Sequence, residues 1–316
     1  MSSSVILLAL FIALILGACC YGGVRMIFST MQNAPDAQAK NYAGRTVSYG
    51  LGFVWIFFAI GMLIIHFIFN DSLLRLVPLA QMPVIVLVVV ACILGLIDDV
   101  YGSSASRGFK GHLKALSSGN LTTGGLKLFG ISATALCVAA LMAPTNTGFA
   151  LFGGVSDFSI ARSGIGSALL YGILAGAGIA LTSNFLNLCD LRPGRALKVY
   201  AALVVLGLII MMFTFRGELV VLTALIALIP FVSVFGLDVG EAGMLGDTGA
   251  NPFGALAGCL IVFALGTNYL GLALYVVAVL GLNLLSEKVS FSHIISSNKF
   301  LSKLDNLGRL DKGNEK

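Results

Sequence analysis

Three short segments of this chain combine carboxylates with glycine or asparagine, and each adjoins a long apolar stretch. They are residues 95–102, 183–195 and 240–251. Adjacent carboxylates repel one another unless a cation lies near them. Ionisable groups at the ends of apolar helices usually line a water-filled cavity. The three segments are therefore candidates for a polar site that binds a cation or a phosphate.

The first segment places Asp98 and Asp99 side by side at the end of an apolar stretch. The alternative interpretation is a pair of helix-end acids that simply face water. Acids at a helix C-terminus oppose the helix macrodipole, so we favour a functional pair. The basic residues that follow in the same loop are Arg107, Lys110, His112 and Lys114.

The second segment spaces Asn184, Asn187 and Asp190 three residues apart. If the preceding helix continues that far, the three side chains share one face. They would then present oxygens to a cation, or amide donors to a phosphate. The alternative is a polar helix end that is stopped by Pro193 and Gly194.

The third segment is a glycine-rich loop that opens a helix. Glycines allow close approach of the backbone to a ligand, and free N–H groups at a helix N-terminus attract phosphate. We expect Asp247 to be the metal ligand, because Mg²⁺ binds one or two carboxylates and completes its coordination with water and phosphate oxygens. Asp238 and Glu241 either support the site or are solvated loop charges.

The composition indicates that the helices carrying these segments lie in a lipid bilayer. Of 316 residues, 58% are hydrophobic and 10% are charged, whereas about a quarter of the residues in a soluble domain are charged. The net charge of +5 does not indicate nucleic-acid binding. The six cysteines lack metal-ligand spacing, so we expect neither zinc nor disulfides.

A spanning helix needs about 20 mostly apolar residues, and the chain contains about nine such windows. They are residues 4–24, 47–69, 77–97, 126–143, 165–183, 197–215, 219–236, 251–266 and 269–286. The boundaries are weakest at the tight loops 216–218 and 266–268, where the two flanking spans could also form one broken helix or a re-entrant pair. The predicted fold is an all-α polytopic bundle, with a small β-hairpin at 149–160 on the outer face.

Lys and Arg accumulate in cytoplasmic loops, and here the two sides differ sharply. Of the 19 Lys and Arg residues, all but Arg75, Arg162 and Arg216 fall on one side. The N-terminus is therefore expected outside and the C-terminus in the cytoplasm. We divide the chain into a transmembrane domain, 1–286, and a cytoplasmic basic tail, 287–316.

Taken together and in this order, the three segments resemble the polyprenyl-phosphate N-acetylhexosamine-1-phosphate transferase superfamily, which includes phospho-N-acetylmuramoyl-pentapeptide transferase. The likeness covers most of the chain. The matching motifs are the paired Asp98-Asp99, Lys110-Gly111, Asn184-x-x-Asn187-x-x-Asp190 and Gly246-Asp247-Thr248-Gly249.

The resemblance implies an Mg²⁺-dependent transfer of a sugar-1-phosphate from a nucleotide sugar to polyprenyl phosphate, for cell-envelope glycans such as peptidoglycan. It implies metal binding by Asp247 and Asp190. It gives catalytic roles to Asp98, Asp99, Asp247 and Lys110. It gives substrate-binding roles to Asn184, Asn187, Asp190, Lys114, Gly246, Thr248 and His293. It further implies a multi-pass plasma-membrane enzyme whose site faces the cytoplasm, and a homodimer by analogy.

The departures from the family pattern all lie at the nucleotide and sugar end. Pro193 stands where the family usually has a second aspartate, Met244 replaces an aromatic residue that stacks on uracil, and Leu237 replaces an asparagine that reads the base. The histidine-rich loop is reduced to His293, and the final helix is absent. The reaction type is thus better supported than the identity of the donor.

Two alternatives stay open. A transporter would carry its charges near the bilayer midplane, whereas these carboxylates crowd one interface. A homologue that has lost sugar transfer would keep the lipid-phosphate pocket and act as a binding or regulatory component of envelope assembly.

Overall fold

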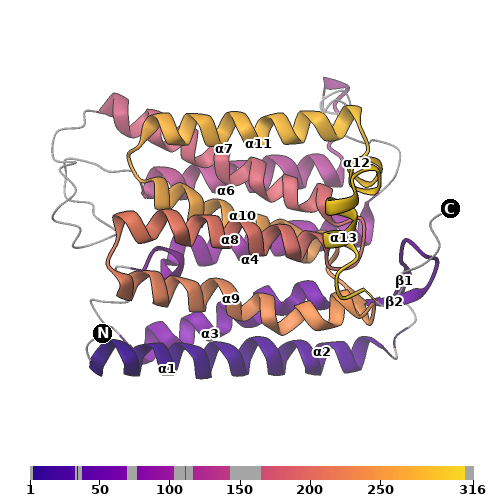
Figure 1. The fold of residues 1–316 in the computed structure, drawn as a ribbon, viewed down its shortest axis with the longest axis horizontal. Coiled ribbons are helices and arrows are strands. Elements are labelled where there is room, and N and C mark those ends of the chain that lie inside the picture. Colours follow the sequence, from indigo (N-terminus) through magenta and orange to yellow (C-terminus); the bar gives the residue numbers. More distant parts are fainter. Residues whose placement is uncertain are drawn as a thin grey trace.

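The computed structural model describes residues 3–32, 34, 38–69, 77–102, 111, 117–142 and 165–309. Within them it is a bundle of long helices that lie alongside one another (Figure 1). The hairpin predicted at 149–160 lies outside these residues.

Nine helices among the described residues are long and apolar enough to cross a membrane. The first span is formed by α1 (Ser3–Gly17), a short π-helix (Ala18–Gly22) and α2 (Gly23–Met31). The others are α3 (Val54–Ile68), α4 (Met82–Tyr101), α6 (Thr123–Leu141), α7 (Ile165–Cys189), α8 (Arg195–Thr214), α9 (Gly217–Val239), α10 (Gly246–Leu265) and α11 (Tyr269–Lys288). The predicted all-α polytopic bundle is confirmed, and the tight loops at 216–218 and 266–268 separate distinct helices.

The helix α10 lies at the centre of the bundle, where it packs against α4, α7 and α8. It is buried along nearly its whole length. Its neighbours also bond to its backbone: Ser183 Oγ donates to the carbonyl of Asn251 at 2.8 Å, and Trp55 Nε1 donates to the carbonyl of Gly249 at 3.2 Å. The N-terminus of α10 is therefore held firmly in place, and it carries Asp247.

A small sheet, which the sequence did not lead us to predict, lies at one end of the bundle (Figure 1). Strands β1 (Gln38–Lys40) and β2 (Thr46–Tyr49) are antiparallel, and β2 pairs in parallel with β3 (Gly243–Met244). The turn between β1 and β2 is closed by Asn41 Oδ1, which accepts from the N–H groups of Ala43 and Arg45 at 3.0 Å each. The sheet brings the segment after α2 beside the loop that precedes α10.

The described part of the predicted basic tail, up to residue 309, folds back onto the bundle. Two short helices, α12 (Phe291–Ser297) and α13 (Lys299–Asp305), follow α11. The guanidinium of Arg195 on α8 donates two hydrogen bonds to the Asp305 carboxylate, at 2.7 and 2.8 Å. Both side chains are buried. Residues 287–309 therefore pack on the same end of the bundle as the sheet.

Candidate functional site

The carboxylates of the first and third sequence segments meet at the end of the bundle that carries the sheet. Asp98 and Asp99 lie in the last turn of α4, which ends at Tyr101, and Asp247 lies in the first turn of α10. The helix α6 begins beside them, with Thr122 Oγ1 capping it by accepting from Gly125 N at 3.0 Å. Three helix ends thus converge on one point.

The ammonium group of Lys127, in the second turn of α6, lies between two of these carboxylates. It forms an ion pair with Asp98 Oδ2 at 2.7 Å and another with Asp247 Oδ2. Thr123, one turn earlier on the same face, donates to Asp98 Oδ1 at 2.6 Å. Lys127 is only 8% exposed, so these ion pairs are weakly screened by water. We call Asp98, Lys127 and Asp247 the charge cluster.

Asp99 has a different position. Its Oδ1 accepts from the N–H of Asp247 at 3.0 Å, and its Oδ2 accepts from the N–H and the hydroxyl of Thr248 at 2.9 and 2.6 Å. It therefore caps the N-terminus of α10 from another helix, and its negative charge favours the positive end of the helix dipole. The catalytic role that the resemblance implies for Asp99 stays a prediction.

The hydrogen bonds of Asp99 correct the expectation that the N–H groups at the start of α10 are free to bind a phosphate. Asp99 already accepts from the N–H groups of Asp247 and Thr248. The N–H of Gly246 bonds to Asp190. Gly246 and Thr248 therefore contact aspartates of the chain in place of the predicted ligand.

Two glycines permit this close arrangement. Gly246 has a φ of +60°, and a Cβ there would lie 2.7 Å from Asp99 Oδ2. A Cβ on Gly95 would lie 2.3 Å from the carbonyl oxygen of Asp247. A larger residue at either position would push α4 and α10 apart, so both glycines are needed for the backbone contact.

Asp190 follows α7 and joins this group electrostatically. Its pKa lies well above its ordinary value, first because it is buried and then because the charges of Asp238, Asp247 and Asp99 lie nearby; the hydrogen bond from Gly246 opposes this shift. Burial and the same two carboxylates, Asp99 and Asp247, raise the pKa of Tyr49 on β2. Asp190 and Tyr49 therefore lie within the electrostatic reach of the charge cluster.

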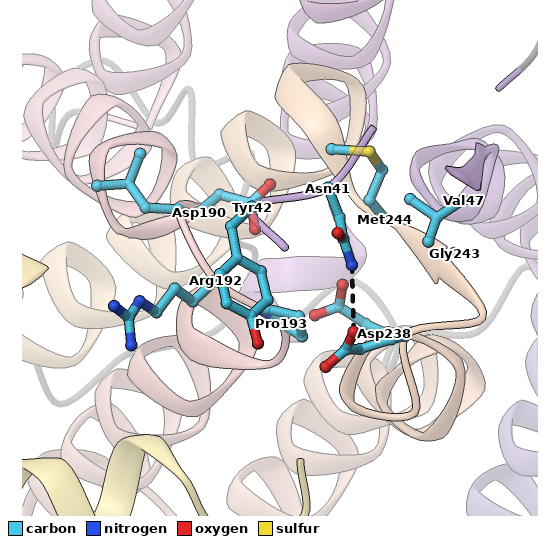
Figure 2. Close-up of a pocket in the computed structure, with 11 residues that line it drawn as sticks. Asn41, Tyr42, Val47, Asp190, Arg192, Pro193, Asp238, Gly243 and Met244 are labelled. Atoms are coloured by element: carbon cyan, nitrogen blue, oxygen red, sulfur yellow. Dashed lines mark hydrogen bonds between the residues drawn. The ribbon is translucent and has the colours of Figure 1, made fainter. Parts of the chain in front are cut away.

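A pocket with a cavity volume of about 50 Å³ lies next to Asp190 and opens to solvent. Figure 2 shows Tyr42, Asp190 and Arg192 on one side and Val47, Gly243 and Met244 on the other. Its complete lining is Asn41, Tyr42, Val47, Asp190, Leu191, Arg192, Pro193, Asp238, Glu241, Gly243 and Met244. The pocket is thus built from the sheet, the loop after α7 and the loop after α9.

The remaining predicted site residues do not all join this group. Asn184 donates to Asn283 Oδ1 on α11 at 2.7 Å, which directs its amide toward a neighbouring helix. Asn187 is partly buried on α7, and His293 is exposed on α12. Lys110 and Lys114 lie outside the described residues, so their predicted roles stay predictions.

Sequence reasoning missed Lys127 and Tyr49. Lys127 entered the sequence argument only as one of the basic residues on one side of the membrane, although Thr123 and Lys127, four apart at the start of an apolar helix, share one face. Nothing local to Tyr49 indicates its position, which depends on the parallel pairing of β2 with β3.

The carboxylates of the site are the kind of ligand that Mg²⁺ prefers. No group of three or more His, Cys, Asp or Glu residues within the described ranges is arranged to hold a metal ion. Mg²⁺ needs only one or two protein carboxylates when phosphate and water supply the rest. Asp98 and Asp247 already share one cation, the Lys127 ammonium. These two carboxylates therefore fit a magnesium ion that arrives with a phosphate substrate.

Comparisons of the chain with protein-family models, with curated proteins and with solved structures found no match. The class of protein that the structure defines is a multi-pass membrane protein with an acidic site at one end of its helix bundle. The resemblance to the transferase superfamily rests on the sequence motifs alone.

Proposed function

We propose that this protein transfers a sugar-1-phosphate from a nucleotide sugar, of the UDP-N-acetylhexosamine type in the family that it resembles, to polyprenyl phosphate. The observation that carries the proposal is the charge cluster. Two carboxylates and a lysine from three membrane helices converge within the electrostatic reach of Asp190, which lines a pocket. Buried ionisable groups of this kind usually mark a functional site in a membrane protein.

The reaction is a phosphoryl transfer. A phosphate oxygen of the lipid forms a bond to the β-phosphorus of the nucleotide sugar, and the bond from that phosphorus to the bridging oxygen breaks. The products are a lipid-linked diphosphate sugar and a nucleoside monophosphate. Because the acceptor phosphate is already ionised, the site needs no general base, and catalysis depends on positioning and charge stabilisation.

The residues of the charge cluster would divide these tasks. Asp98 and Asp247 would hold Mg²⁺, which supplies positive charge to the diphosphate of the donor. Lys127 would keep the two carboxylates in position and offset phosphate charge. Asp99 would fix the turn that carries Asp247, and Asp190 would connect the cluster with the pocket.

The surface of the bundle suits a lipid acceptor. Large apolar side chains are exposed along its helices, among them Leu14, Phe67, Met212, Phe213 and Val232. A polyprenyl chain can lie along such a surface while its phosphate reaches the end of the bundle. We propose that this end faces the cytoplasm of a cell with a plasma membrane, as the distribution of Lys and Arg indicates.

A second candidate function is a homologue that binds lipid phosphate without sugar transfer and serves in regulation or assembly. It is favoured by the existing bonds of the site residues: Lys127 already pairs with both Asp98 and Asp247, and Asp99 accepts from the N–H groups of Asp247 and Thr248. A lysine that already occupies the position between two carboxylates reduces their need of a metal.

The test uses the full chain in detergent with undecaprenyl phosphate, Mg²⁺ and a panel of radiolabelled nucleotide sugars. Label that moves into the lipid phase, and stops with EDTA or in Asp247→Ala, supports the transferase. Glu218→Gln, which changes a carboxylate in the first turn of α9 at the opposite end of the bundle, should leave transfer unchanged. Lipid-phosphate binding without transfer from any donor would support the second candidate, and retained activity in Asp247→Ala would refute the proposed site.

A further inference from the structure

The short helix α13 turns its polar side inward and its apolar side outward. Asp305 is 7% exposed, and its carboxylate accepts two hydrogen bonds from Arg195. Phe300, Leu304 and Leu307, the last in the turn that follows α13, are 70%, 45% and 64% exposed. They are spaced by four and three residues, so they share one face. A helix on a surface in water does the opposite and buries its apolar stripe.

The bonds of α13 place it on the lipid-facing side of α8. Arg195 and Lys198 belong to the first turn of α8, and Lys198 Nζ donates to the carbonyl oxygen of Asp305 at 2.6 Å. The same face of α8 continues about two and three turns further on with Val205 and Ile209, which are both exposed. Because α8 is one of the spanning helices, this exposed apolar face lies against lipid. The helix α13 therefore covers the end of that face, at the level where α8 enters the bilayer (Figure 1).

Positive charge borders the outward face of α13. Lys299 and Lys303 are exposed and lie four residues apart, so they form one edge of the apolar face. Asp305 is the one acidic residue in the sequence between 289 and 309, and it points toward Arg195. A helix with lysines beside Phe and Leu is typical of segments that lie in the membrane interface and are attracted to anionic lipids.

We infer that α13 lies in the headgroup region of the bilayer and binds anionic phospholipids. Phe300, Leu304 and Leu307 contact the acyl chains, while Lys299 and Lys303 contact the phosphate groups. A second copy of the chain suits this face less well, because a two-fold interface would bring the same lysines of both copies together. The inference goes beyond sugar transfer and does not depend on it.

The segment that meets the lipid also contacts the pocket. Arg309 follows Asp305 by four residues, and its guanidinium lies over the ring of Tyr42 at 4.9 Å. It also donates a hydrogen bond to the Tyr42 hydroxyl. Tyr42 lines the pocket next to Asp190. The tail thus connects the membrane interface with one wall of the pocket.

The first test places a tryptophan on the outward face in lipid nanodiscs. The chain has one tryptophan, Trp55, which is buried, so the native chain supplies the signal to subtract. Phe300→Trp should be quenched by phospholipids with brominated acyl chains and shielded from acrylamide. Ala43→Trp is the control, at an exposed position in the turn between β1 and β2 at the same end of the bundle. It should show the reverse pattern.

The second test measures the preference for anionic lipid. Nanodiscs combine phosphatidylcholine and phosphatidylglycerol in equal parts, and only one of the two is brominated. A lysine near an anionic surface favours association by about fivefold, so brominated phosphatidylglycerol should quench Phe300→Trp about twofold more than brominated phosphatidylcholine, or better. Adding Lys299→Gln and Lys303→Gln should remove this difference, whereas Lys40→Gln, an exposed lysine of β1, should keep it. None of these changes should alter the unfolding midpoint in detergent, where no anionic lipid is present.

Three results would contradict the inference. Acrylamide quenching of Phe300→Trp as strong as that of Ala43→Trp would place the face in water. Shielding from both acrylamide and brominated lipid would place it against protein, as in contact with a second copy. Equal quenching by the two brominated lipids while Lys299 and Lys303 are present would refute the binding of anionic phospholipids.

Discussion

Replacing Lys127 by methionine removes the shared cation of the charge cluster while it keeps the length and apolar stem of the side chain. Asp98 and Asp247 would then face each other with no positive charge between them. Removing one partner of a buried ion pair costs about 3–5 kcal/mol. The Asp98 and Asp247 side chains are 16% and 21% exposed. Water can therefore partly solvate them, and we expect a loss near the lower end, about 3 kcal/mol.

The assay is thermal unfolding of the purified protein in detergent without divalent cations. A loss of that size lowers the unfolding midpoint by on the order of 5 °C. The double variant Lys127→Met/Asp98→Asn removes one of the two opposed charges, so it should recover part of the loss. Lys303→Met, at an exposed position on α13, is the matched control and should unfold with the native protein.

Magnesium provides a further arm of the same experiment. If Asp98 and Asp247 can hold a divalent cation, millimolar Mg²⁺ should raise the midpoint of Lys127→Met more than that of the native chain, because the lysine no longer competes. A midpoint of Lys127→Met within 1 °C of the native value would refute the electrostatic account of the cluster. A double variant no better than the single one would refute it equally.

Three further predictions concern other contacts. Gly246→Ala combines a φ of +60° with a Cβ 2.7 Å from Asp99 Oδ2 and should destabilise the protein by about 2 kcal/mol or more; an unchanged unfolding midpoint would contradict this. Asp190 has a raised pKa in the folded state, so the unfolded chain loses this proton first, near pH 4, and stability falls as pH rises from there through the folded pKa. Asp190→Asn should therefore be more stable than the native chain at pH 8 without divalent cations and similar at pH 4, and a pH dependence as steep in the variant as in the native chain would count against this assignment. Asp305→Asn leaves the buried guanidinium of Arg195 without its counter-charge and should cost about 3 kcal/mol, with faster proteolysis of residues 291–309 under limiting trypsin; unchanged cleavage would show that this contact does not hold the tail.

The membrane-spanning helices were predictable because each depends on its own segment of the sequence. Each span needs only a run of apolar residues of sufficient length, and such a run is visible without knowing its neighbours. The convergence of Asp98 and Asp247 at one end of the bundle followed from counting spans. An even number of spans between two residues places both on the same side of the membrane. The structure places both on one lysine.

The contacts of the site were not predictable, because they depend on pairings between distant segments. The bond from Thr248 to Asp99 joins residues 149 positions apart. Tyr49 lies near Asp99 and Asp247 because β2 pairs in parallel with β3, and this pairing consists of only two residue pairs. Asn184 was expected to share a helix face with Asp190, yet α7 ends at Cys189 and the Asn184 amide donates to Asn283 on another helix. Periodicity gives the face of a helix but not the neighbour that covers it.

The order of the cluster residues along the chain has a consequence for synthesis. Asp98 and Lys127 end and begin consecutive described helices, so they can neutralise each other as soon as α4 and α6 have entered the bilayer. Asp99 gains its partners only with α10, the eighth of the nine described spans. Until then its carboxylate lacks the three hydrogen bonds that it accepts from Asp247 and Thr248. The acidic end is therefore completed late in insertion, when the central helix arrives and locks the earlier helices around it.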